Sequence, residues 1–306
     1  MMKNRLFIIL FSGLVYFTAL GETAKTTLVI NSDSNVDIYS KNQKSFEKSY
    51  KGTVLSLNLS DPEWRSLDKV KSYLYDLYPD VIYCIGTKAL LAANKFAPER
   101  KIVFSSTVDC FSLPKNKNTY GISSRLHPGM DLMMMKMLFP KIKKVATFYS
   151  RKYQGEWINV ADTEADKLEL KFTSFSCDSI RGVTKNKLKY LNSFDVLWLT
   201  PDPGVFVNSD KLKMVLDYCY KYKIPVISYT SSLLAHPAVV ASISGDSKTL
   251  GSQGAILVNA LINDEVLGQR TFYPAGTDIR LNRRNCVKMN MEIDETTTGM
   301  VNAILE

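Results

Sequence analysis

Short polar side chains gather at four points where a predicted strand ends. These points are Gly86-Thr87, Ser105 to Asp109, Thr200 to Pro203 and Tyr229 to Ser232. Hydroxyl and carboxylate groups placed in this way can orient a polar small molecule in a cleft. The backbone amides of a helix starting after Gly86 would suit a carboxylate or another anion. The alternative is that the same residues only cap helices and strand ends, as Ser, Thr and Asp commonly do.

The candidate ligand contacts follow from these loops and from two further turns. We expect Asp109 and Asp202 to meet a cationic or hydroxyl group from opposite sides, and their replacement by Ala to weaken binding with little change in folding. Two tyrosines at strand ends could cover an apolar face of the ligand and supply one hydroxyl each. The full set of predicted ligand-binding residues is Ser34, Thr87, Ser105, Asp109, Tyr149, Asp202, Tyr229 and Asp246.

Signatures of catalysis are missing from the sequence. It has no glycine-rich phosphate loop and no serine in a G-x-S-x-G turn. Its only histidines, His127 and His236, are far apart and each precedes a proline, which does not resemble the spacing of a metal site. We therefore predict no catalytic residues, no metal and no cofactor. Asp and Glu are so common in sequences that a catalytic pair of carboxylates cannot be recognised from the sequence. An enzyme therefore stays open as the less favoured alternative.

The elements that must position the candidate residues alternate between strand and helix. Apolar runs predict strands at 27–30, 53–59, 81–85, 102–106, 145–149, 170–176, 195–199, 224–229 and 239–243. Amphipathic segments between them predict helices at 39–50, 63–77, 87–96, 157–168, 183–192, 209–222 and 250–262, and one that starts at His127. In that last helix, Met133, Met134 and Met137 share a stripe that we assign to the core. The alternation predicts α/β architecture with two parallel-sheet lobes, whose ligands bind at the carboxyl ends of strands.

The amino terminus has the pattern of a secretory signal peptide. A basic head is followed by the uncharged run Leu6–Leu20 and by small residues up to Gly21. The run is shorter than the roughly 20 residues that span a bilayer. We predict a signal peptide over 1–21, cleaved near Gly21, and a periplasmic protein. An uncleaved anchor is the alternative.

The amino-acid composition limits the classes of partner that we expect. The chain of 306 residues carries a formal net charge of +9, with 45% hydrophobic and 23% charged residues, which is typical of a globular protein. Its lysines are scattered and no RNA-binding signature accompanies them, so we predict no nucleic-acid partner. The 5 cysteines are odd in number and widely spaced. We expect them to be mostly unpaired and buried, with one disulfide left open.

Several short segments, taken in order, resemble one known family. The segments are Pro79–Ala89 (PDVIYCIGTKA), Lys101–Asp109 (KIVFSSTVD), Asn118–Ser123 (NTYGIS), Leu138–Ala146 (LFPKIKKVA), Val196–Asp202 (VLWLTPD) and Lys223–Val226 (KIPV). They resemble the substrate-binding proteins of ABC transporters of the tryptophan/tyrosine-binding type. The resemblance spans roughly residues 26 to 306. It implies the type I periplasmic-binding-protein fold, with two Rossmann-like lobes joined by a hinge and a ligand enclosed when the lobes close.

Two segments depart from the family pattern. A stretch usually rich in glycine and alanine reads Leu234–Val240 here, and the turn Pro203-Gly204 is unusual. Both lie on the side expected to face the ligand, so an aromatic amino acid is not a secure expectation. The predicted lobes are 26–121 plus 244–272 and 122–243 plus 273–306.

The function predicted from the sequence is binding of a small polar ligand, such as an amino acid, by a monomeric extracytoplasmic protein. The expected partner is an ABC permease in the membrane. A sensor receptor or kinase is the alternative partner, because either could read a conformation whose population the ligand shifts.

Overall fold

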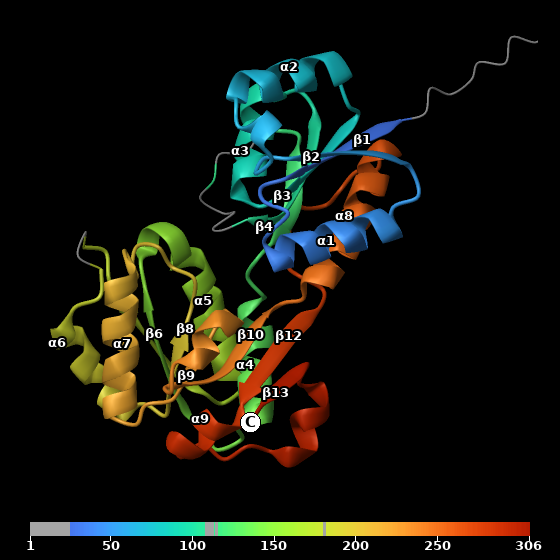
Figure 1. The fold of residues 1–306 in the computed structure, drawn as a ribbon. Coiled ribbons are helices and arrows are strands. Elements are labelled where there is room, and N and C mark those ends of the chain that lie inside the picture. Colours follow the sequence, from blue (N-terminus) through green and yellow to red (C-terminus); the bar gives the residue numbers. More distant parts are fainter. Residues whose placement is uncertain (1–24, 108–112, 114–115, 180–181) are drawn as a thin grey trace, which may run out of the picture.

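The computed structural model describes residues 25–107, 113, 116–179 and 182–306. The predicted signal peptide, Asp109 and Cys110 lie outside the described residues. The chain forms two α/β lobes, each built around its own sheet, one of six strands and one of seven (Figure 1). The predicted fold class is therefore confirmed.

The first lobe contains a fully parallel sheet with the order β11-β5-β4-β3-β1-β2. Its strands are β1 (Thr26–Asn31), β2 (Thr53–Asn58), β3 (Val81–Ile85), β4 (Lys101–Thr107), β5 (Thr119–Ser123) and β11 (Thr271–Phe272). Every residue of β3 is buried, as expected of a parallel strand covered on both faces. Helices α1 (Asp37–Ser49) and α8 (Ser247–Ile262) pack against each other and supply one apolar cluster. Helices α2 (Leu67–Leu77) and α3 (Thr87–Phe96) supply another.

The second lobe contains the sheet β13-β12-β10-β9-β8-β6-β7. Its strands are β6 (Lys144–Tyr149), β7 (Lys171–Ser176), β8 (Val196–Leu199), β9 (Val226–Ser228), β10 (Val239–Gly245), β12 (Thr277–Asn282) and β13 (Ala303–Leu305). Only the β10–β12 pair is antiparallel among these. The helices are α4 (Pro128–Leu138), α5 (Arg151–Lys167), α6 (Lys185–Leu188), α7 (Ser209–Lys221) and α9 (Arg283–Lys288). One large apolar cluster forms the core of this lobe.

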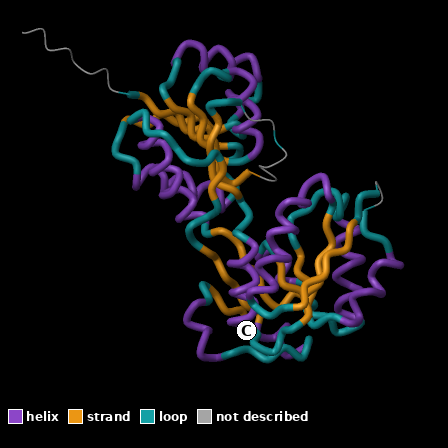
Figure 2. Tube along the Cα trace, turned by 180° about the vertical axis from the view of Figure 1, so that it is seen from behind, coloured by secondary structure: helices purple, strands orange, loops and turns teal. Residues whose placement is uncertain are grey.

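The chain crosses between the lobes three times (Figure 2). The crossings lie between Ser123 and Pro128, between Gly245 and Ser247, and between Phe272 and Thr277. The predicted lobe boundaries fall close to these crossings. That the two segments so bounded behave as separate lobes in solution stays a prediction.

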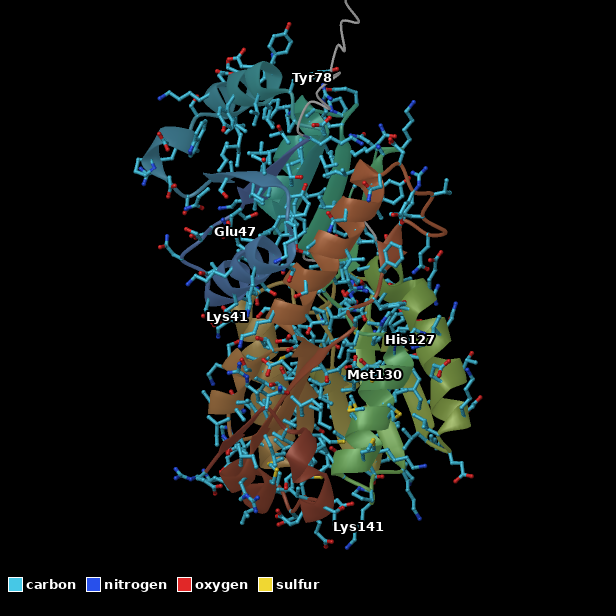
Figure 3. All side chains as sticks on the ribbon, turned by 90° about the vertical axis from the view of Figure 1, so that its right-hand side faces the viewer. Lys41, Glu47, Tyr78, His127, Met130 and Lys141 are labelled. Atoms are coloured by element: carbon cyan, nitrogen blue, oxygen red, sulfur yellow. The ribbon has the colours of Figure 1, made fainter. Side chains whose placement is uncertain are left out.

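Helix α4 corrects one prediction. Met133 and Met137 do not fill the core, because each keeps 37% of its surface exposed. Leu132, Met135 and Leu138 take the buried positions instead. The spacing was compatible with either stripe, and α4 buries the stripe that it needs for its packing beside α5. Met130 is exposed and lies near His127 at the amino-terminal end of this helix (Figure 3).

Several other elements differ from their predicted extents. The helix expected at 63–77 is the 3-10 turn Pro62–Trp64 followed by α2 from Leu67, and the helix expected at 250–262 begins at Ser247. The helix expected at 157–168 begins at Arg151, so its first turn directly follows β6. The helix expected at 183–192 is the single turn α6 followed by the 3-10 segment Lys189–Ser193. The strand expected at 224–229 is reduced to Val226–Ser228. Short elements depend on tertiary contacts more than on local pattern.

The cysteines of the described residues are unpaired and buried, as the sequence favoured. They are Cys84, Cys177, Cys219 and Cys286. Burial raises the pKa of Cys219 to about 12 and that of Cys286 to about 12. These thiols are therefore kept in the unreactive protonated form.

Candidate functional site

The topology turns the carboxyl ends of the parallel strands of each lobe toward the other lobe. Strand β5 leaves the first sheet at its carboxyl end and leads directly into the second lobe, and β10 leads in the same way into the first. Because their neighbours run parallel to them, the loops after β1, β3 and β4 face the loops after β6, β8 and β9. The loops that the sequence singled out are thus on opposing faces.

On the first lobe, the residues at the start of α3 are closely packed against the loop after β1. Gly86 has a φ of +88°, and a Cβ atom there would lie 2.6 Å from Oγ of Ser32. That hydroxyl accepts a hydrogen bond of 3.0 Å from the backbone amide of Ala89. Thr87 is the first residue of the helix and is half-buried. The turn therefore holds the amino-terminal end of α3 at the face of the lobe, where it favours negative charge.

Ser105 belongs to a buried network beneath the same face. Its hydroxyl receives a bond of 3.0 Å from the side-chain amide of Asn42 and lies 2.7 Å from the hydroxyl of Tyr83. Tyr83 donates to the amide oxygen of Asn42 at 2.7 Å. The next residue, Ser106, adopts a φ of +54°, and the β4–β5 register shifts around it. The network fixes this irregular end of β4, and the contact of Ser105 with a ligand stays a prediction.

On the second lobe, Asp202 binds its own loop and the loop after β6. Only 3% of this residue is exposed. Its carboxylate accepts from the amide and hydroxyl of Ser150 at 2.7 and 2.8 Å, and from the amides of Gly204 and Val205 at 2.8 and 3.2 Å. These are capping contacts, the alternative left open by the sequence. A direct contact of Asp202 with ligand stays a prediction.

Like Asp202, Gln154 connects the start of α5 with the loop after β8. Its side chain accepts from the hydroxyl of Thr200 and donates to the carbonyl of Pro201, both at 2.9 Å. The first turn of α5 is therefore held against the loop after β8.

The two predicted tyrosines, Tyr149 and Tyr229, are half-buried and pack against the core of the second lobe. Burial raises the pKa of Tyr229.

The remaining predicted residues lie at the edges of this arrangement. Ser34 follows β1 and exchanges bonds with the side chain of Asn58. Asp246 is the N-cap of α8, and one of its oxygens accepts from the amide and hydroxyl of Thr249 at 2.8 and 2.6 Å. The ligand contacts predicted for both residues, and for Asp109 outside the described part of the chain, stay predictions.

A pocket of about 360 Å³ lies where the first three turns of α5 meet two of the crossing segments. Arg125 and Tyr273 come from the crossings, and Tyr153, Trp157 and others come from α5. The guanidinium of Arg125, a residue only 5% exposed, donates to the carbonyl of Tyr153 at 3.3 Å. The sequence analysis missed this set. The one available signal was a basic residue, Arg125, two positions after the segment Asn118–Ser123.

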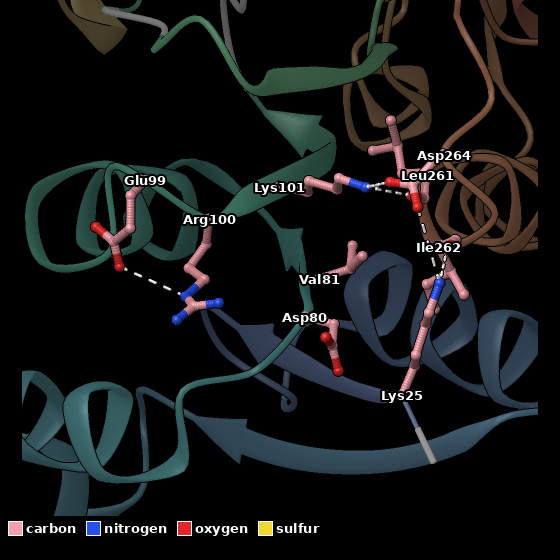
Figure 4. A pocket seen from close by; sticks show the side chains of 9 residues that line it. All are labelled: Lys25, Asp80, Val81, Glu99, Arg100, Lys101, Leu261, Ile262 and Asp264. Atoms are coloured by element: carbon pink, nitrogen blue, oxygen red, sulfur yellow. Dashed lines mark hydrogen bonds and ion pairs between the residues drawn. The ribbon is translucent and has the colours of Figure 1, made fainter. Parts of the chain in front are cut away.

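A second pocket, of about 280 Å³, lies at the far edge of the first lobe (Figure 4). Lys101 bonds the carbonyl of Leu261 at 2.7 Å and pairs with Asp264, and Lys25 bonds the carbonyl of Ile262. Both lysines thus satisfy carbonyls at the carboxyl end of α8. This pocket is a helix-capping site and lies away from the opposing loops.

Two absences hold for the described part of the chain. It contains no group of three or more His, Cys, Asp or Glu side chains arranged to hold a metal ion. None of its helices has the length and apolar character needed to cross a membrane.

Comparison with known proteins identifies the family. The family described as ABC transporter substrate binding protein matches residues 51–296. The chain belongs to this family. It is a family of solute-binding proteins and not of enzymes. The resemblance drawn from the short sequence segments is confirmed. No curated protein sequence matches the chain significantly.

Solved structures share the fold of this substrate-binding protein. The ligand-free, open structure of CD0873, a substrate binding protein with adhesive properties from Clostridium difficile, has a TM-score of 0.66 and 18% identity over 92% of this chain and 99% of that one. The ABC domain in complex with L-Trp from Streptococcus pneumonia has a TM-score of 0.60 and 17% identity over 92% and 100%. A conserved domain protein from Vibrio cholerae has a TM-score of 0.59 and 15% identity over 92% and 99%.

Proposed function

We propose that this substrate-binding protein captures a small polar ligand, such as an amino acid, between its two lobes and delivers it to an ABC permease. The observation that carries the proposal is the opposition of strand-end loops from two lobes that three crossing segments join. This arrangement allows the lobes to close on a ligand. A permease that binds only the closed form would then respond to ligand occupancy.

Specific groups have proposed roles in the cleft. Thr87 and the neighbouring amides of α3 hold an anionic group of the ligand. Tyr149 and Tyr229 cover its apolar face and offer their hydroxyls. Asp202 positions Ser150 and the start of α5. An amino-acid ligand is consistent with the L-Trp complex of the related fold, although two loops depart from the family pattern.

The proposed location is the periplasm, reached through a signal peptide cleaved near Gly21. The family is extracytoplasmic in its function. The protein is proposed to act as a monomer, because each protomer carries both opposing faces.

Ligand binding and closure can be measured together. We expect one member of a panel of amino acids and related small polar molecules to raise the Tm and to reduce the radius of gyration in small-angle X-ray scattering. Tyr149→Phe and Tyr229→Phe each remove one hydroxyl and should weaken binding of that ligand about two- to tenfold, the equivalent of one neutral hydrogen bond. Tyr222→Phe, on the exposed end of α7, is the matched control. A bound ligand that leaves the radius of gyration unchanged would count against closure.

A further inference from the structure

The row of methionines on the solvent face of α4 has no part in the cleft. Met130, Met133 and Met137 keep 38, 37 and 37% of their surface exposed, whereas the opposite stripe of the helix is buried. We propose that this face binds a soft monovalent metal ion, Cu(I), through the thioether sulfurs of Met130 and Met133. The inference does not depend on the ligand of the cleft, because α4 contains none of the predicted cleft residues.

Methionine is concentrated in this helix beyond what packing requires. The chain has 11 methionines, and five of them fall within the eight positions 130–137. Only Met135 among these five is fully buried in the core. An exposed side chain gains less from burial than a core side chain, and lysine, glutamate or alanine would suit an exposed helix position equally well. The property that sets methionine apart from them at a surface is its polarizable sulfur.

Helical geometry places the methionine side chains next to one another. With about 3.6 residues per turn, Met130, Met133 and Met137 lie within an arc of about 60° around the axis of α4. Residues three or four positions apart on a helix have Cβ atoms about 5–6 Å apart. Because a methionine side chain has three rotatable bonds, Met130 and Met133 can turn both sulfurs to one ion between them. Met137 continues the row one turn further along the helix.

The charged groups near this face favour a soft ion over a hard one. Thioether sulfur selects Cu(I), whereas Mg²⁺, Ca²⁺ and Mn²⁺ prefer carboxylate and carbonyl oxygen. Asp131 of α4 is buried, and Lys136 bonds a backbone carbonyl at the carboxyl end of α5. Glu164 of α5 lies beside Gly129 and pairs with Lys167 at 2.6 Å. The exposed methionines therefore present sulfur, and the carboxylates beside them are buried or paired.

The histidine at the start of α4 is not assigned as a ligand. Nδ1 of His127 accepts a hydrogen bond of 3.2 Å from the amide of Gly129, so the neutral imidazole carries its proton on Nε2. A metal ion at Nε2 would move that proton to Nδ1 and break the cap of the helix. The site is therefore assigned to sulfur alone, which disfavours Zn²⁺, because its usual ligands are thiolate, imidazole and carboxylate.

Nuclear magnetic resonance of isotope-labelled methionine methyl groups tests which sulfurs bind the ion. The protein is the full chain without its first 21 residues, with Cys110→Ser to remove the thiol that lies outside the described residues. Ag(I), which has the closed d shell of Cu(I) and does not change its oxidation state here, is the probe. We expect an equimolar amount to shift the methyl signals of Met130 and Met133. The signals of Met214 and Met291, half-buried outside α4, should stay in place, and Zn²⁺ should shift none of the four.

Competition with the Cu(I) chelator bicinchoninate measures the affinity without oxygen. The double variant Met130→Leu, Met133→Leu keeps the apolar volume of the face and should weaken Cu(I) binding at least about tenfold, because it loses both assigned ligands. The matched control, Met214→Leu with Met291→Leu, should bind Cu(I) like the parent. Unshifted signals of Met130 and Met133 with Ag(I), equal Cu(I) affinity of the two double variants, or the same response to Zn²⁺ would overturn the proposal, whether or not the cleft binds its own ligand.

Discussion

Replacing Asp202 by Ala should destabilise the second lobe as well as alter the cleft. The carboxylate is buried and accepts four hydrogen bonds, two of them from the amide and hydroxyl of Ser150. Ser150 is itself buried, so both of its donors would lose their partner without gaining water. Gly204 is half-buried, and water can replace the carboxylate there.

The magnitude follows from the two bonds of Ser150. A hydrogen bond to a charged group contributes about 1.5–3 kcal/mol, so Asp202→Ala should lower the free energy of unfolding by about 3–6 kcal/mol. This result differs from the expectation drawn from the sequence, which was lost binding with little change in folding. Asp202→Asn keeps one acceptor oxygen but turns an NH₂ group toward the remaining donors, and it should fall between Ala and the parent.

Urea unfolding followed by tryptophan fluorescence measures the effect. Trp157 and Trp198 both lie in the core of the second lobe, so the signal reports mainly on that lobe. Asp162→Ala, at an exposed position of α5, is the control and should change stability by no more than about 0.5 kcal/mol. If Asp202→Ala unfolds at the same urea concentration as the control, the capping contacts contribute nothing and the reasoning fails.

Two further predictions concern stability. Burial raises the pKa of Asp131 well above its ordinary value of 3.8, and its Oδ1 has no hydrogen-bond partner. The native state therefore holds this proton more tightly than the unfolded chain and loses stability as pH rises above that ordinary value. Asp131→Asn should raise the Tm at pH 7 by at least about 2 °C, with a gain that vanishes toward pH 4 in a pH series of thermal melts; a gain independent of pH would contradict the assignment. Gly251→Ala would place a Cβ atom 2.2 Å from the carbonyl oxygen of Asn42 and should cost about 1–3 kcal/mol in urea unfolding by forcing α1 and α8 apart. Gly155→Ala, where nothing lies within 4 Å, should instead stabilise α5 by up to about 1 kcal/mol, and equal effects of the two substitutions would refute this account of the α1–α8 contact.

The sequence by itself determined the lobed α/β architecture and most elements. The strand Val81–Ile85 and the helix Thr87–Phe96 were predicted to the residue, because a continuous apolar run and a following amphipathic period are local properties of the chain. The order of short motifs was enough to indicate the family. Strands β12 and β13 were not predicted, because β12 mixes polar and apolar residues and buries only two of its six, and β13 has three residues and forms by pairing with β12.

Only the tertiary structure decided what the polar residues do. Asp202 finds its partner 52 positions away at Ser150, and Arg125 meets Tyr153 across 28 positions, so no local pattern distinguishes a cap from a ligand contact. The same holds for α4, where Met133 is exposed and Met135 is buried although both are methionines of one helix. Local periodicity sets which residues share a face, whereas the packing of separate elements sets which face is buried and which groups meet.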